Sequence, residues 1–282
     1  MRISVCISDA GDDRIARTLR SLSSQGIDEV LVERRGTVAE SRNRMYRESS
    51  SDILAFIDTD QEVPPGWVEA LSGPLRDGDA DFTCGPTRPH PDPRSRSAYA
   101  AYHAELERRH YLRCRNDQTV FPMGNSMWAR YVLEAVASSR STAVDRAGST
   151  GAGVPFDERF TMGGEDFDIN LRATRLGFRG AFVDRAWVWH DQSNLDNPLK
   201  IMRRKLRYCY GGALAHLTNG TRPIQMTRVA VLSSPSNGTA TLRPYVHWLE
   251  GFQKVAQAAG FAAALWSTRS WMFSQRRSSR GT

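Results

Sequence analysis

The first third of the chain repeats short apolar runs that are separated by segments with helical spacing. The apolar runs predict three buried strands, at residues 2–8, 29–33 and 53–57. Between them, the segments 14–24 and 37–48 place apolar residues on one side of a helix. Strands that alternate with helices in this way are typical of an α/β protein with a doubly wound, mostly parallel sheet.

The same patterns continue through residue 217. Further strands are expected at residues 80–84, 180–184 and 186–189. Further helices are expected after Pro64-Pro65 and at residues 97–112, 130–137, 165–176 and 198–217. An extended segment is expected at residues 119–128, and surface loops are expected at residues 86–93 and 138–154.

The character of the sequence changes after residue 219, so we divide the chain into a domain at 1–219 and an extension at 220–282. The extension begins loop-rich, with a strand candidate at 228–232, and continues into an amphipathic helix expected at 245–273. That helix carries Trp and Phe residues and is followed by arginines. It would either pack on the core or lie on an anionic membrane surface, as interfacial helices of this composition do.

Composition narrows the classes of protein that fit. Of 282 residues 40% are hydrophobic, and no apolar run approaches the roughly 20 residues of a membrane-spanning helix. The N-terminus resembles a strand rather than a signal peptide, and four scattered cysteines are expected to be free thiols, which favours the cytoplasm. The net charge of +7 suits phosphate-bearing substrates, or the inner face of a membrane reached through residues 245–282. Because no nucleic-acid-binding motif occurs, nucleic acid is not an expected partner.

Two carboxylates, Asp58 and Asp60, follow the apolar run 53–57 directly. Open α/β sheets bind ligands in the crevice beyond the carboxyl ends of their strands, so both side chains are expected there. Two acids at this spacing repel each other unless a cation lies between them. A divalent cation that also carries substrate phosphates meets that need. A strand followed by an ordinary polar turn explains the same residues without a metal.

A second cluster is suited to proton transfer. Two glycines, Gly163 and Gly164, precede Glu165, Asp166 and Asp168 at the start of an expected helix. Capping and the helix dipole explain acids at this position without any catalytic role. Alternatively, one carboxylate is a general base, and the partial charge of the helix terminus would keep Asp166 ionised.

Two further features have both structural and functional interpretations. His190 ends the strand pattern at 186–189, where an imidazole serves either the fold or a transition metal. Arg42 and Asn43 precede the strand that ends in the two acids. They are residues of the kind that hold a phosphate and a base or ribose edge, although a plain helix surface would also accommodate them.

The order of these motifs resembles the inverting glycosyltransferases of family 2, which have the GT-A fold. The resemblance runs from about residue 2 to residue 190 and rests on the opening strand, an Ala-x-x-Arg-Asn segment, the strand ending in Asp-x-Asp and the Phe-Asp-Glu to Gly-Gly-Glu-Asp-x-Asp segment. It implies a Rossmann-like, mostly parallel central sheet flanked by helices, to which the pattern of residues 220–282 adds a C-terminal helical extension outside the resemblance. It also implies metal-dependent, inverting transfer of a sugar from a nucleoside-diphosphate sugar, with UDP favoured, to an acceptor hydroxyl.

The resemblance assigns roles to individual residues. Asp60 would bind Mn²⁺ or Mg²⁺, with His190 and Asp58 as further ligands. Asp166 would be the general base, and Glu165 would share that role or bind the acceptor. The acceptor would also meet the two glycines of the same motif, Gly163 and Gly164. The donor would be held by residues from four segments, namely Ser8, Asp9, Glu33, Arg42, Asn43, Asp58, Thr59 and Asp60.

The second strand departs from the family pattern, because it ends in Glu33-Arg34-Arg35-Gly36 rather than in paired acids. Recognition of the base is therefore left open. A retaining GT-A transferase and a non-catalytic nucleotide- or carbohydrate-binding homologue are the alternatives to the inverting enzyme. A sugar-phosphate nucleotidyltransferase is disfavoured, because the loop at 9–13 is acidic rather than basic and glycine-rich.

Overall fold

The computed structural model describes residues 1–9, 11–92, 97–144, 153–161, 163–221, 255, 258–260 and 262–266. Its strands are β1 Ile3–Ser8, β2 Glu29–Glu33, β3 Ile53–Asp58, β4 Gln61–Glu62, β5 Phe82–Cys84, β6 Thr87–Pro89, β7 Asn125–Ala129, β8 Gly180–Phe182 and β9 Val188–His190. Its helices are α1 Ile15–Leu22, α2 Val38–Glu48, α3 Trp67–Arg76, α4 Ala98–Cys114, α5 Arg130–Val144, α6 Glu165–Arg175 and α7 Pro198–Thr218.

The central sheet has six strands in the order β2-β1-β3-β7-β5-β8. Strand β1 pairs in parallel with β2 and β3, and β5 pairs in parallel with β8. Strand β7 runs antiparallel to both of its neighbours, β3 and β5. The predicted α/β fold with a mostly parallel sheet is thereby confirmed, with one reversed strand in its middle.

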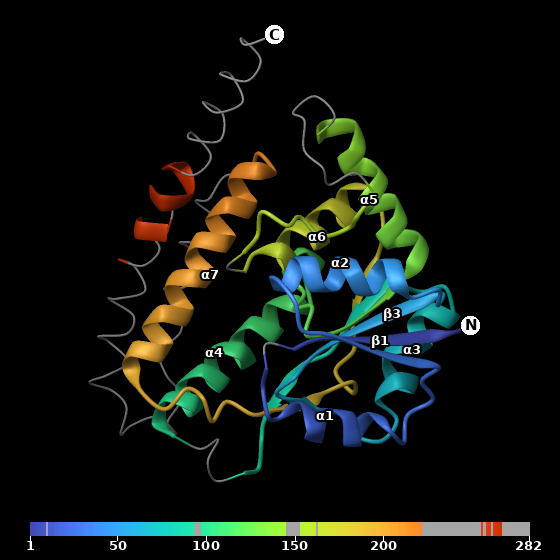
Figure 1. Ribbon diagram of the computed structural model, residues 1–282, viewed down its shortest axis with the longest axis horizontal. Coiled ribbons are helices and arrows are strands. Elements are labelled where there is room, and N and C mark those ends of the chain that lie inside the picture. Colours follow the sequence, from blue (N-terminus) through green and yellow to red (C-terminus); the bar gives the residue numbers. More distant parts are fainter. Residues whose placement is uncertain are drawn as a thin grey trace.

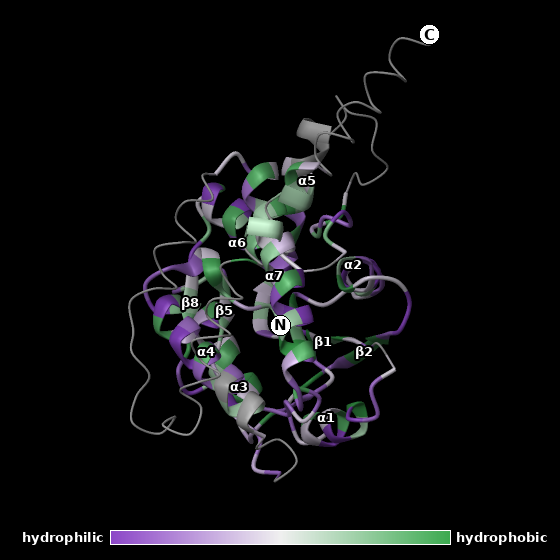
Figure 2. Cartoon of the chain, turned by 90° about the vertical axis from the view of Figure 1, so that its left-hand side faces the viewer, coloured by the Kyte–Doolittle hydropathy of each residue, from purple (hydrophilic) through white to green (hydrophobic). Residues whose placement is uncertain are grey.

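Alternating side chains of the strands point to opposite faces of the sheet, and each face is covered by helices. Cys6, Leu54 and Phe56 belong to the cluster that packs under α2, α5 and α6. Val5 and Ile57 belong to the cluster that packs against α1 and α3. Figure 1 shows α2 and α1 on opposite sides of β1 and β3, and Figure 2 shows the same layering from the side. The fold is a three-layer sandwich.

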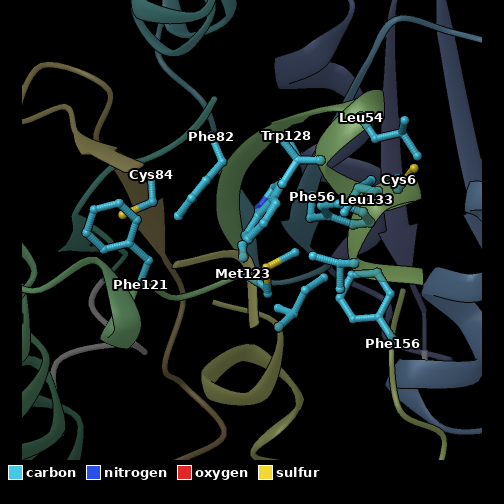
Figure 3. Packing of buried hydrophobic residues seen from close by; sticks show 14 of the residues in the cluster. Cys6, Leu54, Phe56, Phe82, Cys84, Phe121, Met123, Trp128, Leu133 and Phe156 are labelled. Atoms are coloured by element: carbon cyan, nitrogen blue, oxygen red, sulfur yellow. The ribbon is translucent and has the colours of Figure 1, made fainter. Parts of the chain in front are cut away.

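The aromatic part of the first cluster lies around β5 and β7. Phe82 and Trp128 stack with their ring centroids 4.3 Å apart, and Phe56 meets Phe156 edge-on at 5.5 Å. Figure 3 shows these rings together with Met123 and the other buried residues between the sheet and the helices above it. This packing fixes the position of β3, the strand that ends at the predicted acids.

Several predicted boundaries differ from the structure. The segment 86–93 was expected to be a loop, but it contains β6, which pairs with β9 in a second, three-stranded sheet. Residues 138–144 were expected to begin a loop, but they form the end of α5, and residues 145–152 lie outside the described residues. The segment 119–128 is not one extended piece, because a 3₁₀ turn at Gln118–Val120 precedes β7. The first of these differences arises because pairing with the distant strand β9 overrides the local pattern.

Only part of the C-terminal extension is described. The strand candidate at 228–232 and most of the helix expected at 245–273 lie outside the described residues. Gly260 and Ala264 are packed, and a Cβ built at Gly260 would lie 2.8 Å from the backbone nitrogen of Tyr210 in α7. Val255 and Trp266 are 65% and 79% exposed. Among the residues described, no helix is both long enough and apolar enough to cross a membrane. The cysteines are free and buried, as predicted.

Candidate active site

Three predicted donor-binding residues lie side by side at one edge of the sheet. Ser8 is in register with Glu33 on one neighbouring strand and with Asp58 on the other. All three strands are parallel, so their carboxyl ends meet at this edge. The hydroxyl oxygen of Ser8 is buried and has no hydrogen-bond partner in the described part of the chain. A buried hydroxyl without a partner is costly, and it suits a position that a polar ligand completes.

The acids nearest to β2 are bound by the arginines that depart from the family pattern. Nε of Arg34 donates to Asp9 at 2.8 Å, and Nη2 of Arg35 donates to Glu33 at 2.9 Å. Nε of Arg44 also donates to Glu33 at 2.9 Å. The hydrogen bonds from Arg35 and Arg44 hold the pKa of Glu33 well below its usual range. Glu33 is therefore an ionised residue with cationic neighbours at the place predicted for the nucleotide.

The two acids at the end of β3 differ in environment. The Asp58 side chain is 49% exposed, whereas that of Asp60 is 15% exposed. Burial and the charge of Asp60 raise the pKa of Asp58. Burial also acts against ionisation of Asp60, but His190 and Arg14 outweigh it and lower the pKa of Asp60. Two neighbouring carboxylates with opposite shifts are typical of functional sites.

The room beside Asp58 depends on a glycine. A Cβ built at Gly124 would collide with both oxygens of the Asp58 carboxylate. Gly124 directly precedes Asn125, the first residue of β7, which runs antiparallel to β3. Thr59, between the two acids, is buried, and its backbone oxygen accepts a hydrogen bond from Thr18 of α1 at 2.8 Å. The turn that carries the acids is thus held from both sides.

His190 reaches Asp60 because β9 pairs with β4, which places His190 opposite Gln61. Nε2 of His190 lies 3.3 Å from Oδ2 of Asp60, and Nδ1 lies 3.2 Å from Oε1 of Glu107 in α4. Burial acts against a charged ring, yet Glu107 and Asp60 together raise the pKa of His190 well above its usual value. Gln192 donates to the other oxygen of Glu107 at 2.7 Å.

These residues fit a divalent cation. Metal-bound histidines usually turn their second ring nitrogen toward a carboxylate, as His190 does toward Glu107. Asp60 and His190 supply one oxygen and one nitrogen, a set that suits Mn²⁺ or Mg²⁺ when phosphates and water supply the remaining ligands. The described residues contain no group of three His, Cys, Asp or Glu side chains arranged to hold a metal by themselves.

Arginines not identified from the sequence surround this corner. Nη2 of Arg14 lies 3.7 Å from Asp60, and its Nη1 donates to the backbone oxygen of Asp191 at 2.6 Å. Arg17 pairs with the Asp191 carboxylate. Neither these arginines nor Glu107 has a local sequence signal, because each lies on a helix or a helix start with ordinary charged neighbours. They reach the site because α1 packs against β4 and α4 packs against β6, the strand that pairs with β9.

The opposite side of the site is formed by α2 and α6. Nη1 of Arg42 donates to Oε1 of Glu165 at 3.0 Å, and its Nη2 lies 3.9 Å from Asp58. The guanidinium carbon lies 5.6 Å from the centre of the Phe156 ring. Arg42 therefore joins the predicted donor residues to the predicted catalytic motif.

Asn43 has a different environment from its neighbour. It is fully buried, and its side chain exchanges hydrogen bonds with the backbone of Phe156 and donates one to Glu158. Both polar ends of the Asn43 amide are therefore used by the protein. Asn43 therefore stabilises the segment before Gly163 and does not lie at the strand ends.

Asp166 and Glu165 start α6 after two glycines in the left-handed region, both with φ of 96°. Glu165 is buried against Arg42, whereas Asp166 is partly exposed and accepts a hydrogen bond from the backbone N–H of Phe167 at 2.8 Å. The sequence predicted that the helix terminus would dominate the pKa of Asp166. Instead, burial outweighs the hydrogen bond and the nearby Arg42, and the pKa of Asp166 is raised.

Both glycines lie against α7. Cβ atoms built at Gly164 or Gly211 would overlap the backbone of the other segment. His216 stacks near Phe167 with ring centres 4.7 Å apart, and Asn219 donates to Asp168 at 2.8 Å. Asp168 also pairs with Arg172 at 2.7 Å. The third acid of the motif thus joins α6 to the end of α7 and does not face the strand ends.

Comparison with known proteins agrees with the motifs. Residues 2–136 match the model of glycosyl transferase family 2. The first half of the chain is therefore similar to the family that its motifs resemble, and the predicted enzyme class, a glycosyltransferase, is confirmed. No curated protein matches the sequence.

The chain is also similar to solved structures. Glucosyl-3-phosphoglycerate synthase from Mycobacterium tuberculosis, in complex with phosphoglyceric acid, is 18% identical, with a TM-score of 0.50 over 78% of this chain and 81% of that chain. The same enzyme with Mn²⁺, UDP-glucose and phosphoglyceric acid is 19% identical, with a TM-score of 0.48 over 78% and 80%. S. aureus TarS is 12% identical, with a TM-score of 0.43 over 96% and 92%. The first of these confirms the GT-A fold.

Proposed function

We propose that this chain, whose residues 2–136 match the model of glycosyl transferase family 2, is a metal-dependent inverting glycosyltransferase. It moves a sugar from a nucleoside-diphosphate sugar, with UDP favoured, to an acceptor hydroxyl. One observation carries the proposal. Nε2 of His190 lies 3.3 Å from Oδ2 of Asp60, and Nδ1 of the same ring lies beside the Glu107 carboxylate. Asp166 is close enough to Asp58 for the charge of Asp58 to raise the pKa of Asp166.

The donor occupies the ends of the parallel strands. The unpartnered hydroxyl of Ser8 bonds to the nucleoside, and Asp9 and Glu33 flank it with their arginines. Asp58 and the backbone at Thr59 contact the ribose or the diphosphate. Arg42 lies 3.9 Å from Asp58 and contributes positive charge where the leaving diphosphate gains negative charge. Asn43 acts indirectly, because its side chain fixes the backbone at Phe156.

Asp60 and His190 would hold the cation, with Asp58 as a further ligand, and Glu107 keeps the His190 ring in place. When bound, Mn²⁺ or Mg²⁺ stabilises the charge that develops on the leaving diphosphate. In its absence His190 carries a proton, because Glu107 and Asp60 both raise its pKa. The cation and that proton therefore compete for the same nitrogen.

Asp166 removes the proton from the acceptor hydroxyl. Its raised pKa makes it a stronger base than an exposed aspartate, and its partial exposure leaves it accessible. Glu165 is held by Arg42 and serves the acceptor side together with Gly163 and Gly164, which lie against α7. Attack from the face opposite the leaving group inverts the anomeric carbon.

A hydrolysis screen of UDP-, GDP- and dTDP-sugars with Mn²⁺ tests the proposal. One donor should turn over in the wild type and in Asp77→Asn, an exposed acid directly after α3 that serves as the matched control. Asp60→Asn and Asp166→Asn should each lower turnover. The mechanism fails if no donor reacts, or if both variants retain full turnover. Proton NMR of the product distinguishes inversion from the retaining alternative, and donor binding without turnover would favour the non-catalytic homologue.

We also propose that the extension at 220–282 holds a cytoplasmic enzyme at the inner face of a membrane. Gly260 and Ala264 face α7, which leaves Trp266 and Val255 strongly exposed. Exposed aromatic residues beside basic ones suit an anionic lipid surface. Anionic liposomes should float the wild type better than Trp266→Ser or a chain truncated after residue 244. Equal flotation of all three would contradict this.

A further inference from the structure

One face of α7 borders the catalytic motif. Arg204, Tyr208 and Gly211 follow one another at helical spacing, so they share a side of the helix. Gly211 meets the backbone of Gly163, and a Cβ built at Gly163 would lie 3.3 Å from Cδ1 of Tyr208. The Tyr208 ring therefore lies directly beside the first glycine of the motif. This helix lies beyond the segment 2–136 that matches the family.

Arg204 has an unusual set of neighbours. Its Nε donates to the hydroxyl of Tyr208 at 3.0 Å, and its guanidinium carbon lies 5.5 Å from the centre of that ring. Within the described parts of the chain, no carboxylate lies at ion-pair distance from it. Burial acts against its charge, yet Tyr208, Glu107 and Asp60 raise its pKa. The acids of the site therefore stabilise the positive charge of Arg204, although none of them forms an ion pair with it.

The free groups of this pair match an anion. The Tyr208 oxygen accepts the Arg204 hydrogen bond, so its own O–H is left to donate. The terminal nitrogens of a guanidinium form a planar fork that fits two oxygens of a phosphate or carboxylate. Such an anion beside Asp58, Asp60 and Asp166 would be repelled by three acids. The positive charge of Arg204, on the α7 side, offsets that repulsion.

We propose that Arg204 and Tyr208 bind an anionic group, phosphate or carboxylate, on the acceptor. This inference rests on the proposed function, which places the acceptor beside Gly163 and Asp166. The acceptor is favoured over the donor diphosphate because the ring of Tyr208 lies against Gly163. On the donor side, Arg42 lies beside Asp58, and Arg14 lies beside Asp60.

Calorimetric titration with glycerol 3-phosphate and with glycerol tests the proposal, because these probes differ by one phosphate. Both are titrated with and without UDP and Mn²⁺. Glycerol 3-phosphate should bind the wild type more tightly than glycerol does. Arg204→Gln should lower the affinity for glycerol 3-phosphate about 10-fold or more, as expected for loss of a charged hydrogen bond. The same substitution should change the affinity for UDP with Mn²⁺ less than about twofold. Tyr208→Phe should produce a smaller loss of the same kind.

The matched control is Arg203→Gln, which removes an exposed arginine one position away on the same helix. Equal losses in Arg203→Gln and Arg204→Gln would overturn the proposal, since they would reflect net charge alone. Equal binding of the two probes to the wild type would also overturn it. A loss of affinity in Arg204→Gln that is confined to UDP with Mn²⁺ would assign Arg204 to the donor instead. Failure of the wild type to bind UDP with Mn²⁺ would count against the proposed function, whereas the nucleotide-free titration still reports on Arg204.

Discussion

Nδ1 of His190 lies 3.2 Å from Oε1 of Glu107, while Nε2 of the same ring lies 3.3 Å from Oδ2 of Asp60. Glu107 therefore fixes the imidazole through Nδ1, while Nε2 faces Asp60. Glu107→Gln should keep the ring in place but remove the negative charge behind it. We expect affinity for Mn²⁺ to fall about 10- to 100-fold, as for other outer-shell partners of metal-bound histidines.

Mn²⁺ binding can be followed by electron paramagnetic resonance of the free ion. Glu105→Gln is the matched control, because Glu105 lies on the same helix and pairs with Arg108 and Arg109 instead. Unchanged Mn²⁺ affinity in Glu107→Gln would show that the contact between Glu107 and His190 does not tune the site.

Gly124→Ala should impair activity without unfolding the protein. The added methyl group would collide with the Asp58 carboxylate, a short side chain that must then rotate away from its present position. We expect donor turnover to fall about 10-fold or more, since small displacements at a reacting centre are costly. Gly26→Ala is the control, because a Cβ there meets nothing within 4 Å. Turnover and melting temperature are measured for both variants, and full activity of Gly124→Ala would contradict the role of Asp58.

The pH dependence of turnover should report Asp166. Burial raises its pKa above the usual value, and a general base works only when deprotonated. Turnover should therefore fall as the pH is lowered through this raised pKa. Asp166→Asn should lower kcat about 100- to 10,000-fold and abolish that acid limb, while binding of UDP with Mn²⁺ is retained. An acid limb that persists in Asp166→Asn would belong to another group.

Glu33 should make the folded state sensitive to acid. Hydrogen bonds from Arg35 and Arg44 hold its pKa well below the usual value. Its contribution to the free energy of unfolding is therefore complete above the pKa of an unfolded glutamate and is lost as the pH falls through the depressed value. Denaturant unfolding of the wild type and Glu33→Gln should give a difference that shrinks as the pH is lowered below about 4. A difference independent of pH would exclude this linkage.

The sequence was informative where the structure is local or strongly patterned. The apolar runs predicted the parallel strands β1, β2 and β3, and the order of motifs assigned Ser8, Glu33 and Asp58 to one donor site; the three residues lie in register at one edge of the sheet. The pairing of His190 with Asp60 also agrees with the predicted metal corner. These predictions needed only periodicity and the order of motifs.

Other features could not be read from local sequence. Glu107 reaches His190 only through the arrangement of α4 beside β9, and no neighbouring residue marks it. The hydrogen bonds between Asn43 and Phe156 span more than a hundred positions in the chain. The raised pKa of Asp166 depends on how much protein covers it, which the position of the acid at a helix start does not indicate. Each of these depends on the tertiary arrangement rather than on spacing.

The contact of Gly211 with Gly163 and Gly164 sets a limit on length variation in the chain before α7. Removing one residue ahead of this helix would advance the sequence by one position, and Gly212 would take the place of Gly211. Adding one residue would bring Tyr210 to the contact, where no side chain fits. Homologues should therefore change the length of the segment between His190 and α7 only in ways that leave the register of α7 unchanged.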